Sequence, residues 1–177
     1  MRGGFGRQNW CSHALLAGGP FATPQGVAHV DTLRDTATAL QTEILARRYY
    51  ECFNQRLFDV GERYVHSQAV FTYPLSGKQF IGRAGYRELA RRWIAAFPDG
   101  TVSIIKLRVS DGPTVRLDWV AHGTFAGVLD LPGSAPIPAT GIHTHLLMRE
   151  TIRISNGLIV ESTMEFDPDE LRHHLSA

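Results

Sequence analysis

The chain has 177 residues, of which 44% are hydrophobic and 20% charged, and its formal net charge is +1. This composition is ordinary for a globular protein whose length favours one domain with its own core. The near-neutral charge excludes the basic surface that nucleic-acid binding needs, and no apolar run reaches the ~18 residues of a membrane span.

The first 32 residues differ in composition from the rest of the chain. They are rich in Gly, are interrupted by Pro20 and Pro24, and show no clear periodicity. We interpret residues 1–32 as an N-terminal extension or arm, which could be a pairing segment of an oligomer, and residues 33–177 as the folded domain.

A long helix is predicted where the arm ends. From Thr32 the sequence has strong helix formers and contains neither Gly nor Pro for 20 residues. Its apolar residues fall into two neighbouring stripes, one with Ala37, Leu40 and Ile44, the other with Leu45, Tyr49, Cys52 and Phe53.

A strand and two further helical segments follow. "DVGERYV" predicts a short second helix at most, and "QAVFTYPL" predicts a strand that ends at Pro74. The clearest helix is "GRAGYRELARRWIAAFPDG", because Glu88 lies within reach of Arg91 and Arg92 on one face while the apolar residues share the other. The residues of this apolar face are Tyr86, Leu89, Ala90, Trp93 and Phe97.

The second half of the chain predicts strands joined by turns. "TVSIIKLRVS" and "TVRLDWVAHGTF" are separated by a turn signal at 111–113, and the second segment alternates apolar and polar residues. A proline-rich loop, "GVLDLPGSAPIPATG", leads to the longest strand, "IHTHLLMRETIRI", and "SNG" turns the chain into a last strand. Asp167, Pro168 and Glu170 then give the start signal of a short final helix. Helices grouped early and strands grouped late predict an α+β fold, with a curved antiparallel or mixed sheet wrapped around the helices.

Glu150 is the strongest candidate for chemistry. Alternation along the longest strand puts this carboxylate on the apolar face that carries Leu146, Met148 and Ile152. A buried carboxyl without a cation has a raised pKa, which suits a general acid or base at neutral pH. The alternatives are a core Glu held by a helix Arg, or a strand bulge that turns the side chain outward.

His143 and His145 lie on the opposite face of the same strand, at a spacing that can bind a metal. The sequence names no further ligands, and Arg149 and Arg153 on that face would repel a cation. We therefore interpret this face as a polar surface or an interface and expect no metal. Nucleotide-binding loops and a hydrolase nucleophile elbow are also missing from the sequence.

Five segments resemble, in order and spacing, the SnoaL-like polyketide cyclases of the nuclear transport factor 2-like superfamily. They are "YYECFNQ", "AVFTYP", "GRAGYRELARRWIAAFPD", "WVAHGTFAG" and "NGLIVESTMEFDPDELRHHL", from about residue 40 to 175. The resemblance implies a cone-shaped sheet curled around an internal apolar pocket and closed by helices. It also implies a homodimer and acid–base chemistry without a cofactor.

The resemblance also assigns positions. The family's acid–base Asp in the last strand falls on Met164, so this position lacks the usual acid, and a slip of one residue would turn Glu165 inward instead. An assisting histidine falls on Glu150. A polar residue of the first strand falls on Tyr73, whose hydroxyl could equally lie at the rim in water. The pocket residues that we predict are Phe71, Trp93, Trp119, Met148, Ser162, Met164 and Phe166.

Two functions follow from these residues. In a cofactor-independent enzyme, Glu150 would remove a proton next to a carbonyl and Tyr73 would stabilise the enolate oxygen. The reaction would be intramolecular aldol cyclisation, isomerisation or dehydration of a small or polycyclic, largely apolar carbonyl compound. The second function is that of a non-catalytic ligand-binding or accessory domain. An epoxide hydrolase-like enzyme is a weaker alternative, because that branch also needs an Asp where Met164 stands.

The expected location is the cytoplasm. Cys11 and Cys52 make no disulfide framework, which fits a reduced compartment. The N-terminal stretch "ALLAGG" is too short and too rich in Gly for the apolar core of a signal peptide. The partners that we expect are a small-molecule substrate and a second copy of the chain, with no nucleic acid and no membrane.

Overall fold

A computed structural model describes residues 25–73, 78–110, 113–130 and 135–176 of the chain. Helices and strands follow the predicted α+β order, with strands grouped in the second half. In chain order the elements are α1 (Gln25–Asn54), α2 (Phe58–Gly61), the 3₁₀ helix η1 (Glu62–Tyr64), β1 (Val65–Thr72), β2 (Gln79–Ile81), α3 (Gly82–Ala96), β3 (Thr101–Val109), β4 (Thr114–Thr124), β5 (His143–Ser155), β6 (Leu158–Glu165) and α4 (Pro168–Ser176).

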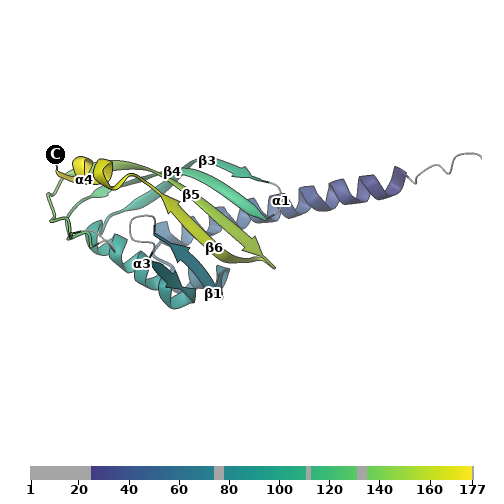
Figure 1. Ribbon diagram of the computed structural model, residues 1–177, viewed down its shortest axis with the longest axis horizontal. Coiled ribbons are helices and arrows are strands. Elements are labelled where there is room, and N and C mark those ends of the chain that lie inside the picture. The colour runs from purple at the N-terminus through teal and green to yellow at the C-terminus, as the bar shows by residue number, and fades with distance from the viewer. Residues whose placement is uncertain (1–24, 74–77, 111–112, 131–134, 177) are drawn as a thin grey trace, which may run out of the picture.

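The strands form one mixed, open sheet with helices on one face. Its strand order is β2-β1-β6-β5-β4-β3, and β1 pairs with β6 in parallel while the other neighbours are antiparallel. α3 packs against β1 and β2, and the second half of α1 packs against β3 and β4 (Figure 1). The first half of α1 projects from the body, and α4 lies at the other end of the molecule. The core fills the space between the sheet and these helices.

The structure confirms the predicted faces of α3. Tyr86, Leu89 and Trp93 are buried, and Arg92 forms an ion pair with Glu88 one turn earlier, at 2.8 Å. The helix begins at Gly82, which has a φ of +63° and whose Cβ, if it had one, would lie 2.2 Å from the Ser67 carbonyl oxygen. Only glycine fits this start, because both the backbone conformation and the close approach exclude a side chain.

The β5–β6 hairpin fixes which side chains of the last strand face the core. Asn156 and Gly157 form a two-residue turn with φ of 50° and 73°, as the "SNG" signal predicted. The turn pairs Ser155 with Leu158, and farther along Glu150 lies opposite Met164. Because side chains alternate along a strand, Ser162 and Met164 face inward with Glu150, and Glu165 is exposed on the outer face.

Three features differ from the prediction. α1 begins at Gln25 rather than at Thr32, because a weak start with Gly26 and Val27 hid seven residues of a helix. The three-residue strand β2 was not predicted, because it is too short to show an alternation of apolar and polar residues. The alternation also gave no sign that β1 and β6 pair in parallel, since this contact joins distant segments. Residues 1–24, Pro74 and the 111–112 turn lie outside the described residues.

Candidate active site

An aromatic cavity lies between the sheet and helices α1 and α3. It holds about 780 Å³ of space between protein atoms, its open end included. The wall is contributed by both helices and by β1, β3, β4, β5 and β6. Its aromatic residues are Tyr49, Tyr50, Phe53, Phe71, Tyr86, Trp93, Phe97 and Trp119. A largely apolar, concave space of this kind is the usual form of a small-molecule site.

Several buried polar groups around this cavity have no hydrogen-bond partner within the described part of the chain. On the cavity wall these are the hydroxyls of Tyr50 and Tyr86 and the indole nitrogens of Trp93 and Trp119. Folded proteins leave few buried polar atoms unpaired, and each unpaired group costs about 1–3 kcal/mol. An indole N–H can only donate, so the wall offers donors to a ligand that carries acceptor oxygens.

Glu150 is held inside the fold by one hydrogen bond. Its side chain is 1% exposed, and the Ser162 hydroxyl on β6 donates to its Oε1 at 2.5 Å. The second oxygen, Oε2, is buried without a partner, and the ion pairs found among the described residues do not include this carboxylate. This arrangement contradicts both alternatives from the sequence, a helix Arg partner and an outward bulge.

The surroundings of Glu150 set its acidity. Burial raises the pKa of this carboxyl from its ordinary value of 4.5 to about 7, and the hydrogen bond from Ser162 lowers it in part. The pKa of Tyr49 is raised mainly by burial and next by the nearby charge of Glu150. Met164 lines the cavity and lies opposite Glu150 in the β5–β6 ladder, and Tyr49, also on the wall, is close enough for the charge of Glu150 to raise its pKa. The carboxyl therefore lies near this part of the wall without itself lining it.

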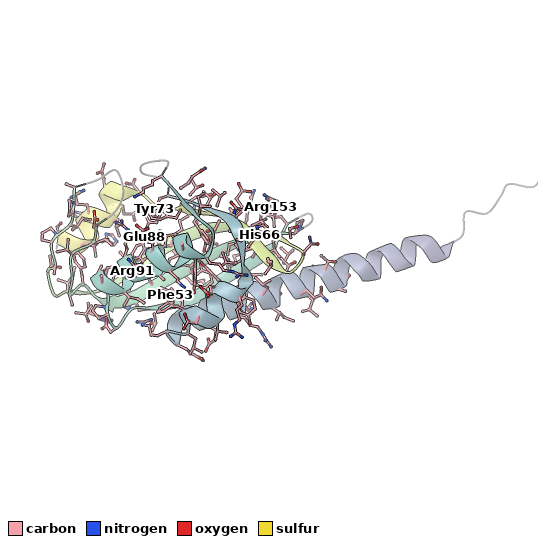
Figure 2. All side chains as sticks on the ribbon, turned by 90° about the horizontal axis from the view of Figure 1, so that it is seen from below. Phe53, His66, Tyr73, Glu88, Arg91 and Arg153 are labelled. Carbon is pink, nitrogen blue, oxygen red and sulfur yellow. The ribbon has the colours of Figure 1, made fainter. Side chains whose placement is uncertain are left out.

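Tyr73 occupies a different part of the core. It follows β1, and β6 separates it from β5, so roughly two strand spacings of ~4.8 Å lie between Tyr73 and Glu150. Its ring packs edge-on against Phe80 and Phe166. Tyr73 is labelled in Figure 2. Burial raises the pKa of Tyr73, and the nearby Trp93 indole lowers it in part, although neither polar atom reaches hydrogen-bond geometry.

The other predicted pocket residues divide into two groups. Phe71, Trp93, Trp119 and Met164 line the cavity. Met148, Ser162 and Phe166 do not: Met148 is buried in the sheet, Ser162 holds Glu150, and Phe166 packs on Tyr73. The sequence reasoning placed Tyr49 and Tyr86 on apolar helix faces, did not single out Tyr50, and so missed the place of all three on the cavity wall. Their signal was three tyrosines, each with a polar tip, on apolar helix faces.

The outer face of the sheet carries three histidines. His145 lies next to His122 and His143, with ring centroids 4.8 and 5.5 Å apart. Within the described ranges, no group of three or more His, Cys, Asp or Glu side chains could hold a metal ion. None of the helices in those ranges is long and apolar enough to cross a membrane.

Comparisons with known proteins agree on this fold. The family model described as SnoaL-like polyketide cyclase matches residues 43–173. No curated protein gives a significant match. Among solved structures, a protein assigned as a SnoaL-like polyketide cyclase from Jannaschia sp. CCS1 is 15% identical, with a TM-score of 0.67. That match covers 78% of this chain and 94% of the other.

Two further solved structures widen the range of described activities. IdmH from Streptomyces antibioticus, assigned as a polyketide cyclase, is 24% identical with a TM-score of 0.64, and the match covers 77% of this chain and 99% of that one. A protein from Kribbella flavida assigned as a ketosteroid isomerase is 18% identical with a TM-score of 0.52, over 73% of this chain and 83% of that one. At these identities the likeness shows the fold alone.

Proposed function

Because the chain belongs to the SnoaL-like polyketide cyclase family, we propose that it is an acid–base enzyme acting on an apolar carbonyl compound. One observation carries this proposal: the carboxyl of Glu150 is buried with an unpartnered Oε2 and lies opposite Met164 of the cavity wall, and this burial raises its pKa to about 7. A group with this pKa is divided between acid and base at neutral pH, which suits proton transfer in either direction. The cyclase and isomerase names of proteins with this fold are consistent with that chemistry.

In the proposed step, Glu150 acts as general base through its unpartnered Oε2. The carboxylate removes a proton from the carbon next to the substrate carbonyl, and the electron pair of that C–H bond moves onto the carbonyl oxygen. The enolate then attacks a second carbonyl of the same molecule and closes a ring, or it takes the proton back at another carbon. In both outcomes the protonated Glu150 returns its proton, so the step needs no oxidant and no reductant.

Donors on the cavity wall stabilise the developing enolate oxygen. The indole nitrogens of Trp93 and Trp119 and the Tyr50 hydroxyl are buried, unpartnered and on the wall. Preorganised donors of this kind are worth more in a dry cavity than in water. Tyr73 remains a candidate for the same role, because its buried hydroxyl lies beside Trp93 and could reach a ligand that moves into the wall.

Access to Glu150 requires Met164 to move. Met164 is half-buried, lines the cavity and lies opposite Glu150 in the β5–β6 ladder. A methionine side chain is unbranched and adapts its shape more readily than other apolar residues. We propose that it yields to the reacting end of the substrate, so that the cavity and the carboxyl form one site when a ligand is bound.

The test is exchange of the protons next to a carbonyl. Aromatic ketones such as 1-tetralone, incubated in D₂O, would be followed by NMR with the wild-type protein, with Glu150→Gln and with Glu165→Gln. Glu165 is the matched control, because it is the exposed acid next to Met164 on the outer face. The expected result is accelerated exchange by wild type and E165Q and only background exchange with E150Q. Full activity of E150Q would show that Glu150 is not the general base.

A ligand-binding domain without catalysis has one observation in its favour, which is that Glu150 does not line the cavity. The same experiment separates this function from the enzyme. Binding of the ketone, seen as shifted protein resonances, with no acceleration of exchange by any variant would favour a binding domain.

A further inference from the structure

A polar groove crosses β3, β4 and β5 on the outer face of the sheet, on the side away from the aromatic cavity. It encloses about 750 Å³ of space between protein atoms, its open side included. The outward-pointing residues that border it are Lys106, Arg108, Arg116, Asp118, Arg149, Thr151 and Glu165. The groove and the cavity share no lining residue, so a ligand in the groove would not occupy the proposed active site.

A β-bulge in β3 turns two of the cations into this groove. The register with β4 shifts between Ile104 and Lys106, which leaves Ile105 as an extra residue without a partner. In an unbroken strand, Lys106 and Arg108 would point to the same face as Ile104, which packs on the core. Because of the bulge they are exposed on the outer face instead, and Leu107 packs on the core. Bulges re-aim side chains in this way near functional sites.

Strand pairing sorts the charges of this face into rows that run across the sheet. Two rows contain both signs of charge. The first consists of Lys106, Asp118, Arg149 and Glu165, whose signs alternate from β3 to β6. In the second, Arg153 lies opposite Glu161 and forms an ion pair with it at 2.8 Å. Each of these rows therefore supplies its own counter-charges.

The row between these two contains only positive charge. Arg108 lies directly opposite Arg116, and Thr151 and Thr163 continue the row on β5 and β6. Neither guanidinium forms an ion pair with a residue that the structure describes. Like charges directly opposite each other in an antiparallel pair are destabilising. The fold thus holds two guanidinium groups side by side without a counter-charge of their own.

We propose that Arg108 and Arg116 bind the phosphate group of a small phosphomonoester, with the half-buried Thr151 hydroxyl as a third donor. A phosphomonoester carries about two negative charges at pH 7, which match the two guanidinium groups, whereas a carboxylate carries one. A guanidinium donates through a planar fork that fits two phosphate oxygens. The site is separate from the proposed chemistry and does not depend on it.

The neighbouring rows limit the ligand to one phosphate group on a small molecule. Asp118 and Glu165 border the same groove and would repel a second phosphate or an extended polyanion such as a nucleic acid. The net charge of the chain is only +1, which also disfavours a polyanion.

A titration of the full chain with phenyl phosphate tests the site, followed by protein NMR at low ionic strength, where charge interactions are least screened. Benzoate is the comparison ligand, because it carries the same ring on a carboxylate. The variants are Arg108→Gln and Arg116→Gln, and the matched control is Arg153→Gln, an exposed arginine that already pairs with Glu161.

The expected result is saturable binding of phenyl phosphate, at least about tenfold tighter than that of benzoate. R108Q and R116Q should each weaken phenyl phosphate binding about tenfold, with R153Q unchanged, and inorganic phosphate should compete for the site. Equal weakening in R153Q would show a general attraction by surface charge and would overturn the proposal. Unchanged binding in R108Q and R116Q, or equally tight binding of benzoate, would also overturn it.

Thermal unfolding gives a second measurement that does not use the NMR signal. Without phosphate, R116Q should be at least as stable as wild type, because the substitution removes a repulsion between like charges. Phenyl phosphate should raise the melting temperature of wild type and not that of R116Q. A lower melting temperature of R116Q in the absence of phosphate would show that Arg116 has a stabilising partner in the free protein, which contradicts the proposal.

Discussion

Charged side chains on the two faces of β5 differ in their exposure to water and in their partners. Arg149 and Glu150 are neighbours in the chain, yet Arg149 has a 70% exposed side chain and a loose ion pair with Asp118 at 3.7 Å, while Glu150 is 1% exposed. Farther along the outer face, Arg153 pairs with Glu161 on β6 at 2.8 Å. On the inner face, β6 offers Glu150 only the Ser162 hydroxyl.

This difference shows that the face of the strand on which a charged side chain lies decides whether that side chain keeps its ordinary acidity or has it shifted. Charges on the outer face are hydrated and exchange partners at little cost, so they contribute little to stability. The carboxyl on the inner face has lost its water and gained one hydrogen bond, so its acidity changes instead. Four variants test the comparison, from the largest expected effect to the smallest.

Glu150→Gln should make stability less dependent on pH. The folded state of wild type raises the pKa of this carboxyl from 4.5 to about 7, so the folded protein binds the proton more tightly than the unfolded chain. The wild-type free energy of unfolding should therefore fall as pH rises from about 4.5 to about 7, by about 3 kcal/mol from this group. Urea unfolding of both proteins at pH 5 and pH 8 measures the difference, in which the shared histidines cancel. Parallel pH dependences would contradict the buried carboxyl.

Ser162→Ala should raise the pKa of Glu150 further, because the hydrogen bond from Ser162 lowers it. A hydrogen bond to a charged group contributes about 1.5–3 kcal/mol, which corresponds to roughly one to two pH units. Since the carboxylate is the active form, activity of wild type should rise through about pH 7, and in S162A the midpoint should move to higher pH. The profile of ketone proton exchange against pH measures this shift. An unmoved midpoint would mean that Glu150 is not the titrating base.

Tyr50→Phe should weaken ligand binding about 5–10-fold and leave stability unchanged or slightly higher. The reason is that the Tyr50 hydroxyl is buried without a partner on the cavity wall, so removing it costs the free protein nothing. Tyr64→Phe is the control, because Tyr64 lies in η1 and does not line the cavity. Ketone titrations by NMR and thermal unfolding measure both effects. Equal affinities for the two variants would remove Tyr50 as a donor.

Arg153→Ala should change the free energy of unfolding by less than about 0.5 kcal/mol, because its ion pair with Glu161 is half-exposed on both sides. Urea unfolding at low and at high salt checks this value. A loss of unfolding free energy comparable to the effect of Glu150→Gln would show that ion pairs on the outer face do contribute to stability.

Local patterns in the sequence predicted much of the fold. The faces of α3, the alternation of β4 and β5, the turn at Asn156 and Gly157 and the N-cap Asp167 are all as expected, since each depends on neighbours within a few residues. The parallel contact of β1 with β6 joins segments far apart in the chain, and no local pattern encodes it.

The site was predicted in part for the same reason. Alternation alone pointed to Glu150 as a buried carboxyl, and the family resemblance pointed to Met164 as the position that lacks the usual acid. The hydrogen bond from Ser162 depends on the pairing of β5 with β6, which includes a register shift between Arg153 and Ile154. A shift of this kind cannot be located from side-chain types, so the sequence did not predict that Ser162 is the hydrogen-bond partner of Glu150.

The tight turn at Asn156 and Gly157 has a consequence for folding fidelity. If one residue were added there, β6 would present Glu161, Thr163 and Glu165 to the core in place of Ser162 and Met164. Two more carboxylates would then lose their water beside Glu150, which is far costlier than the native arrangement. The register-shifted hairpin is thus disfavoured by its own side chains. Once the turn has formed with the native register, the shifted hairpin is too high in free energy to be populated beside it.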